Sequence, residues 1–212
     1  GLAACLMLAL MLGPAAASGT ALGVNPDAEA ERRAQRHLLS VGSDVLIGDR
    51  VVTGVTGQVE VRFDDQTELV VGPSSSLLIE DYLLRADGSA GKLAINALAG
   101  SFRFVTGGAP KDRYTIRTPT GTIGVRGTAF ELYVTQAWTY ILMQHGSVEA
   151  CNEAGQCMVL EAVCELGQIS AGDAIVIGST DGVPAADRAT LREMFIYAAD
   201  QRPLLRAFRI AN

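Results

Sequence analysis

The chain has 212 residues, of which about half are apolar, enough to bury one sizeable core and to indicate one main domain. Acidic side chains outnumber basic ones, 23 to 17, and give a formal charge of -6. This excess of negative charge opposes the phosphate neutralisation on which nucleic-acid binding depends, so we expect no nucleic-acid partner.

Residues 1–17 have the pattern of a secretory signal peptide. An uncharged apolar run from Leu2 to Leu12 is followed by a Gly-Pro pair and three alanines. The run is shorter than the roughly twenty residues that a membrane-spanning helix needs. We predict cleavage before Ser18 and a periplasmic or secreted chain with no transmembrane span after cleavage. A retained signal anchor or a buried helix is the alternative.

Residues 18–40 are predicted to be a linker with a short helix. Asn25 is a possible cap, Pro26 would take the first helical position, and Asp27 and Glu29 would lie in the first turn. Few apolar positions follow, which predicts a polar lead-in rather than part of the core.

Residues 41–178 contain short apolar and polar alternations separated by turn-forming residues. In one example, alternation over 58–63 is followed by Asp64-Asp65-Gln66 and a returning run at 67–71, which predicts a hairpin. Further strands are predicted at 77–79, 92–98, 101–105, 114–117, 139–143, 147–150, 158–160 and 174–177. About ten short strands without an intervening helix predict an all-β domain, built as a sandwich, a barrel or a short solenoid. The recurring glycine turns favour a rolled or solenoid-like sandwich.

Residues 179–212 are predicted to be a helical extension. Leu191, Met194, Phe195 and Ala198 follow the spacing i, i+3, i+4 and i+7, which is typical of one face of an amphipathic helix. Such a stripe most simply packs on the β domain. A docking helix for a partner is the alternative.

The cysteines beyond the leader lie close together in the sequence. Cys151 and Cys157 flank a turn-forming segment at 152–156, so a disulfide across a hairpin is predicted. Pairing of Cys164 with either of them, or a free thiol, remains open. A metal site would need a fourth ligand, and no histidine lies near the three sulfurs.

The sequence predicts no catalytic group and no cofactor. His37 and His145 lie outside metal-binding spacings and outside a G-x-S-x-G motif. The pair Asp64-Asp65 is explained by the hairpin turn. We therefore expect a non-enzymatic protein.

The stretch TPTGTIGVRGTAF at 118–130 predicts a bend. Its apolar residues occupy odd positions up to Ala129, whereas apolar residues from Phe130 onward occupy even positions. Because a strand alternates faces at every residue, one extra residue must be absorbed, which predicts a bulge or corner near Gly127-Thr128. No helix follows the glycines, so the stretch lacks the helix terminus of a phosphate-binding loop.

Several arginines precede or lie within this stretch. In the structural interpretation, Arg126 binds carbonyls or a carboxylate within the fold. In the functional alternative, four arginines form a patch that binds a small anionic or glycan ligand. The candidate patch comprises Arg103, Arg113, Arg117 and Arg126.

Four segments together, at 48–82, 100–107, 114–132 and 145–150, resemble the FecR domain. The resemblance extends over roughly residues 40–177, and its most specific part is the pattern T-P…G-V-R-G-T-x-F. The signature residues are Thr118, Pro119, Gly124, Val125, Arg126, Gly127, Thr128 and Phe130. The hairpin differs from the family pattern because Gln66 replaces a glycine, and the cysteine cluster is an addition.

The resemblance implies a β-rich extracytoplasmic domain without enzymatic activity. It implies a role in protein binding, scaffolding or signal relay at the bacterial envelope, with another envelope protein as the partner. In the family's regulatory member, a cytoplasmic region and a transmembrane helix precede the domain. Here an apolar leader stands in that place, so a stand-alone exported FecR-domain protein is expected.

Overall fold

The described chain consists mainly of β-strands. The computed structural model describes residues 17–84, 90–107, 114–184 and 186–210. Within these residues, hydrogen bonds join the strands into one 15-stranded network. This confirms the predicted all-β class, but the strands are more numerous than expected and several are long. The predicted signal peptide lies outside the described residues except for Ala17, the first residue of β1.

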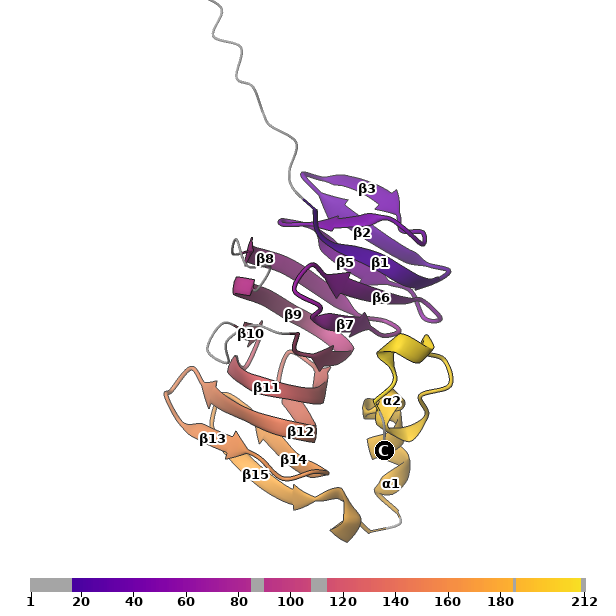
Figure 1. Cartoon of the computed structure of the whole chain (residues 1–212). Coiled ribbons are helices and arrows are strands. Elements are labelled where there is room, and N and C mark those ends of the chain that lie inside the picture. Colours follow the sequence, from indigo (N-terminus) through magenta and orange to yellow (C-terminus); the bar gives the residue numbers. More distant parts are fainter. Residues whose placement is uncertain (1–16, 85–89, 108–113, 185, 211–212) are drawn as a thin grey trace, which may run out of the picture.

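The strands are arranged in two layers, stacked from β3 at one end to β15 at the other (Figure 1). The first layer contains, in order of pairing, β4 (Asp44–Leu46), β1 (Ala17–Asn25), β6 (Gln58–Phe63), β7 (Glu68–Val71), parts of three long strands, β14 (Glu165–Ile169) and β15 (Ala174–Ser179). The second layer contains β3 (Gln35–Leu38), β2 (Ala28–Arg32), β5 (Arg50–Thr53), β8 (Ser76–Leu84), β10 (Tyr114–Thr118) between other parts of the long strands, and β13 (Cys157–Leu160).

The three long strands belong to both layers. They are β9 (Ala90–Val105), β11 (Gly121–Val134) and β12 (Thr139–Asn152). Their bends coincide with Gly100, Gly127 and Gly146, whose φ angles are +106°, +64° and +88°. These backbone conformations favour glycine because it lacks a Cβ. The predicted corner is confirmed, since the register of β11 against β12 shifts between Arg126 and Ala129.

The main hydrophobic core lies between the two layers. Phe63 of the first layer lies 5.5 Å from Tyr82 of the second, and Phe104 lies 5.8 Å from Tyr114, measured between ring centroids. The Tyr114 hydroxyl also donates a hydrogen bond of 2.7 Å to the buried carboxylate of Asp65. Aromatic contacts and a buried hydrogen bond thus connect the two layers. The Asp65 carboxylate has its hydrogen-bond partners within the fold.

The predicted linker and helix at 18–40 are wrong, because this region forms β1, β2 and β3. Ala28 and Ala30 are buried and pair with Thr53 and Val51 of β5. Their spacing of two residues matches a strand with one buried face, and tertiary pairing outweighs the helix propensity of Ala, Glu and Arg. Two residues with positive φ, at 33–34, make the turn between β2 and β3.

The C-terminal extension is shorter in helix than predicted. The single expected helix is replaced by α1 (Arg188–Met194) and α2 (Ile196–Ala199), followed by a 3₁₀ turn at Arg206–Phe208. We call residues 188–210 the C-terminal segment. It lies against the outer face of the first layer (Figure 1). The interpretation that its apolar residues pack on the β domain is therefore confirmed, although Ala198 is exposed.

Candidate functional site

The signature stretch forms the corner at which β11 passes between layers. Val125 before the corner and Phe130 after it are both buried in the core. At the corner, the backbone N–H of Thr128 donates a hydrogen bond to Thr106 Oγ1 at 2.9 Å. The Thr128 hydroxyl donates to the His145 carbonyl, beside the bend of β12. These contacts give the signature a structural role in holding the bends together.

The start of the signature closes the turn between β10 and β11. The Thr118 hydroxyl donates to the Gly121 carbonyl at 3.2 Å, and the Thr120 hydroxyl donates to Thr139 Oγ1 at 2.8 Å. A Cβ at Gly121 would lie 2.2 Å from the Cys151 carbonyl oxygen, so the two backbones approach too closely for a side chain. Pro119 is half-buried beside this turn, and Gly124 follows on β11.

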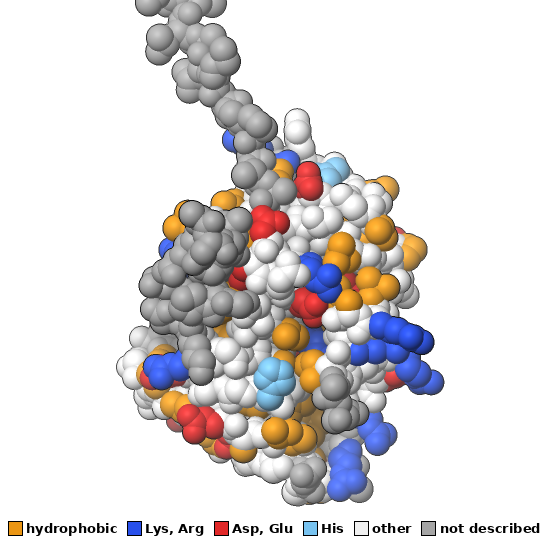
Figure 2. Space-filling view, viewed as in Figure 1, with side chains coloured by type: hydrophobic (Ala, Val, Ile, Leu, Met, Phe, Trp, Pro, Cys, Tyr) orange, Lys and Arg blue, Asp and Glu red, His pale blue; other side chains and the backbone are white. Residues whose placement is uncertain are grey.

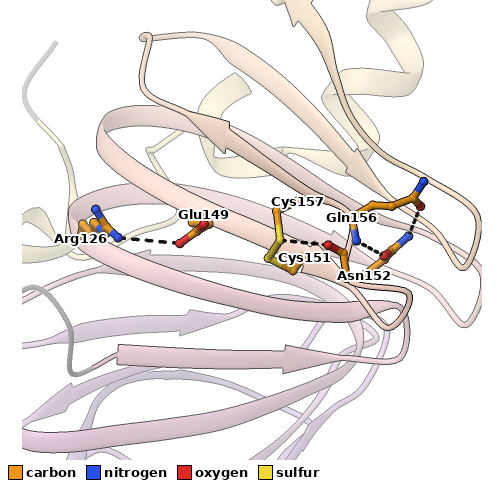
Figure 3. The surroundings of a disulfide bond; sticks show 7 residues. Arg126, Glu149, Cys151, Asn152, Gln156 and Cys157 are labelled. Atoms are coloured by element: carbon orange, nitrogen blue, oxygen red, sulfur yellow. Dashed lines mark hydrogen bonds and ion pairs between the residues drawn. A yellow bond between two sulfur atoms is a disulfide. The ribbon is translucent and has the colours of Figure 1, made fainter.

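The four candidate arginines do not form one patch in the described residues. Arg126 projects outward from the second layer, with its guanidinium 3.8 Å from Glu149 (Figure 3). Arg117 pairs with Glu80 in the same layer. Arg103 is buried in the first layer, and Arg113 lies outside the described residues. The side chain of Arg126 is largely exposed, so it does not point into the core.

The predicted disulfide between Cys151 and Cys157 is confirmed. The two residues are register partners in β12 and β13, and their sulfurs are bonded at 2.00 Å (Figure 3). Cys164 is a free thiol. Glu149 lies near the disulfide, but sulfurs that are bonded to each other do not supply the thiolates of a metal site.

The outer face of the first layer holds two polar clusters under the C-terminal segment. In the first cluster, the Tyr197 hydroxyl donates to Gln58 Oε1 at 3.0 Å, and Gln58 Nε2 donates to Glu60 Oε1 at 3.1 Å. The other oxygen of Glu60 accepts the backbone N–H of Leu205 at 3.0 Å. Burial raises the pKa values of both Glu60 and Tyr197. These bonds fix the C-terminal segment to β6.

The second cluster surrounds Arg103, which is 1% exposed. Its Nη1 donates to Gln201 Oε1 at 3.1 Å, and its Nη2 donates to Gln144 Oε1 at 2.6 Å. Gln144 in turn donates to Glu131 Oε1 at 2.7 Å. Hydrogen bonds from the backbone of Ala198 and Tyr197 also reach the Glu131 carboxylate. Burial nevertheless raises the pKa of Glu131 to about 7.

The C-terminal segment presents a basic outer surface on an otherwise acidic protein. Figure 2 shows Lys and Arg side chains gathered on the side where Figure 1 places this segment. Its exposed arginines are Arg188, Arg192, Arg202, Arg206 and Arg209. Three of them are held locally, Arg202 by Asp200, and Arg188 and Arg209 by backbone carbonyls. The segment thus covers a polar face of the first layer and presents a positively charged surface to solvent in its place.

Sequence reasoning missed Glu131, Gln144 and Gln201. Glu131 and Gln144 occupy outward positions of strands, where a polar residue is ordinarily solvated. The available signal was the apolar content of the C-terminal segment, which required a face to pack against. It did not indicate which polar side chains that face would carry.

Comparison with known proteins gives one family match. Residues 49–149 match the model of the FecR family, described as FecR protein. No curated protein matches the chain in sequence. Within the described residues, no helix reaches the length and hydropathy required to cross a bilayer.

Two crystal structures of a candidate anti-sigma factor from Parabacteroides distasonis ATCC 8503 are similar to the chain. The first has a TM-score of 0.49 and 13% identity, and the match covers 66% of this chain and 62% of that one. The second has a TM-score of 0.48 and 14% identity, and the match covers 69% of this chain and 74% of that one.

Proposed function

Because the chain carries a FecR domain at residues 49–149, we propose that it is an exported, non-enzymatic module that binds another protein and so relays a signal or forms a scaffold at the bacterial envelope. The family supports a role in signal transduction. The apolar leader at 1–17 supports export.

The observation that carries this proposal is the open edge of β15. This strand pairs with β14 on one side and ends the first layer in the described chain. Its three central residues, Ile175, Val176 and Ile177, are 46%, 44% and 48% exposed. An edge strand offers unpaired backbone N–H and C=O groups to another strand, and apolar side chains on both faces add burial when that strand binds.

The edge at the opposite end of the stack has a different character. All four residues of β3 are exposed, and Arg36 and His37 lie among them. Charged residues on an edge strand disfavour pairing with another chain. No charged residue lies between Ala174 and Ser179 in β15. We infer that the partner contributes an extended, largely apolar strand that continues the first layer beyond β15.

A substitution on this edge tests the proposal. Ile177→Lys places a charge on an exposed position of β15, whereas Val159→Lys does the same on β13, where Val159 is also 48% exposed. Wild type and both variants would be used to capture partners by crosslinking in envelope preparations. We expect the crosslinked partner to be lost with Ile177→Lys and retained with Val159→Lys. Equal capture by all three, or no partner for wild type, would contradict strand addition at β15.

Export is tested separately with a fusion to alkaline phosphatase, which is active only after it leaves the cytoplasm. Residues 1–30 behind an initiating methionine should give an active fusion, whereas a fusion that starts at Ser18 should not. Activity from neither fusion would contradict the export part of the proposal.

A further inference from the structure

A cavity of about 380 Å³ lies between β12 and the C-terminal segment. Its volume falls within the range of small-molecule sites. It is lined by Arg103, Leu142, Met143, Gln144, His145, Val163, Cys164, Ala198, Gln201 and Ile210. A neighbouring cavity of about 170 Å³ shares Leu142 and Ala198 with it and adds the apolar side chains of Leu191 and Phe195. The lining thus combines apolar walls with a few polar groups, the usual composition of a ligand site.

The cavity contains a buried cation without a bonded counter-ion. Arg103 does not take part in any ion pair among the described residues. Two neutral amides, Gln144 and Gln201, hold its Nη atoms, and its Nε has no hydrogen-bond partner. The nearby Glu131 carboxylate is occupied by Gln144 and by backbone groups of the C-terminal segment. Buried charges in proteins are normally paired, and an unpaired buried donor is costly.

We propose that this cavity binds a small organic acid with one carboxylate, and that the guanidinium group of Arg103, which lines the cavity, recognises the carboxylate. The two amides orient the guanidinium before the ligand arrives, which lowers the entropic cost of binding. One arginine matches one negative charge, and the neighbouring Glu131 disfavours a second charge on the ligand. Leu142, Val163 and Ile210 offer apolar surface to the rest of the molecule. This site is independent of strand addition at β15, so either proposal can fail alone.

The test is a titration of the ¹⁵N-labelled chain from Ser18 to Asn212 with acetate, butyrate and benzoate, each beside its neutral amide. The signal to follow is the Nε–Hε resonance of Arg103 in a ¹H–¹⁵N spectrum. We expect at least one acid to shift this resonance saturably, with half-saturation in about the millimolar range for a ligand of this size. The matching amide should produce no such shift.

Three variants distinguish recognition by Arg103 from other effects. Arg103→Gln should weaken binding at least about tenfold, the loss expected for one charge-assisted hydrogen bond. Ala198→Trp keeps Arg103 but fills the cavity from an exposed position of α2, and it should weaken binding similarly. Arg126→Gln removes an exposed arginine of the other layer and should leave binding unchanged.

Three results would overturn the proposal. The first is that no acid shifts the Arg103 resonance at about 50 mM, far above the half-saturation expected for such ligands. The second is that amides bind as well as acids. The third is that a folded Ala198→Trp variant binds acids as tightly as wild type, which remains decisive even if Arg103→Gln does not fold.

Discussion

Gly146→Ala tests whether the bends of β11 and β12 depend on a close approach of two backbones. Gly146 has a φ of +88°, and a Cβ there would lie 2.3 Å from the Gly127 carbonyl oxygen and 2.7 Å from the Thr128 Cα. The atoms in the way belong to the backbone of the adjacent bend, so they cannot rotate aside as a flexible side chain would. The change therefore combines backbone strain with overpacking.

The magnitude follows from these two contributions. A non-glycine residue at a positive φ lowers the free energy of unfolding by about 1–2 kcal/mol. Overpacking of a tightly packed site lowers it by about 1–3 kcal/mol more. A loss of about 2–5 kcal/mol is large against a typical stability of about 5–15 kcal/mol. Gly155→Ala is the matched control, because Gly155 has a φ of +79° and open space around its missing Cβ. It should lose only about 1–2 kcal/mol.

Urea unfolding of wild type and both variants, followed by circular dichroism, gives the free energies of unfolding. We expect Gly146→Ala to be less stable than Gly155→Ala by more than about 1 kcal/mol. Equal losses in the two variants would refute the argument from close approach, because both carry the same strain in φ.

Three further predictions concern stability. Burial raises the pKa of Glu131 from 4.5 to about 7. The protonated side chain therefore contributes fully to the stability of the fold below about pH 4.5. Up to about 3 kcal/mol of this stability is lost as the pH rises from there through about 7. The difference in unfolding free energy between wild type and Glu131→Gln should change accordingly between about pH 5 and 8, and a constant difference would contradict this. Gln66 has a φ of +70°, so Gln66→Gly should raise stability by about 0.5 kcal/mol, and a lower urea midpoint would count against it. Reducing the Cys151–Cys157 disulfide, which closes a loop with a separation of 6 residues, should cost about 2 kcal/mol in the same assay, whereas unchanged stability would contradict a folded-state crosslink.

The features that the sequence predicted correctly are those determined by neighbouring residues. Alternation over 58–63 and the turn after it were sufficient for the hairpin of β6 and β7. The turn formers between Cys151 and Cys157 indicated the disulfide, although they left the pairing of Cys164 open. The change of parity between Val125 and Phe130 located the corner at Gly127, because the two faces of a strand follow directly from residue number.

The features that the sequence did not reveal depend on distant partners. In β2 only two buried apolar residues, Ala28 and Ala30, show the alternation of a strand. This segment forms a strand because it pairs with β5, which lies more than 20 positions further along the chain. The alternation of apolar residues around Arg103 and Glu131 shows that both side chains point away from the main core. It does not show that the C-terminal segment covers them. The alternation of residues along a strand determines on which face each side chain lies. Whether that face is buried depends on what packs against it.

The corners link the signature to the cavity, although no signature residue lines it. In β11 the buried residues change from odd to even positions at the corner, so Glu131 faces outward. The same change occurs at Gly100 in β9, which places Arg103 outward, and at Gly146 in β12, two residues after Gln144. Without the change of parity at its corner, Arg103 or Glu131 would point into the apolar core, where an ionised side chain is strongly disfavoured. The glycine bends are therefore a condition for the polar cluster, and a family signature that does not itself line the cavity determines which side chains can line it.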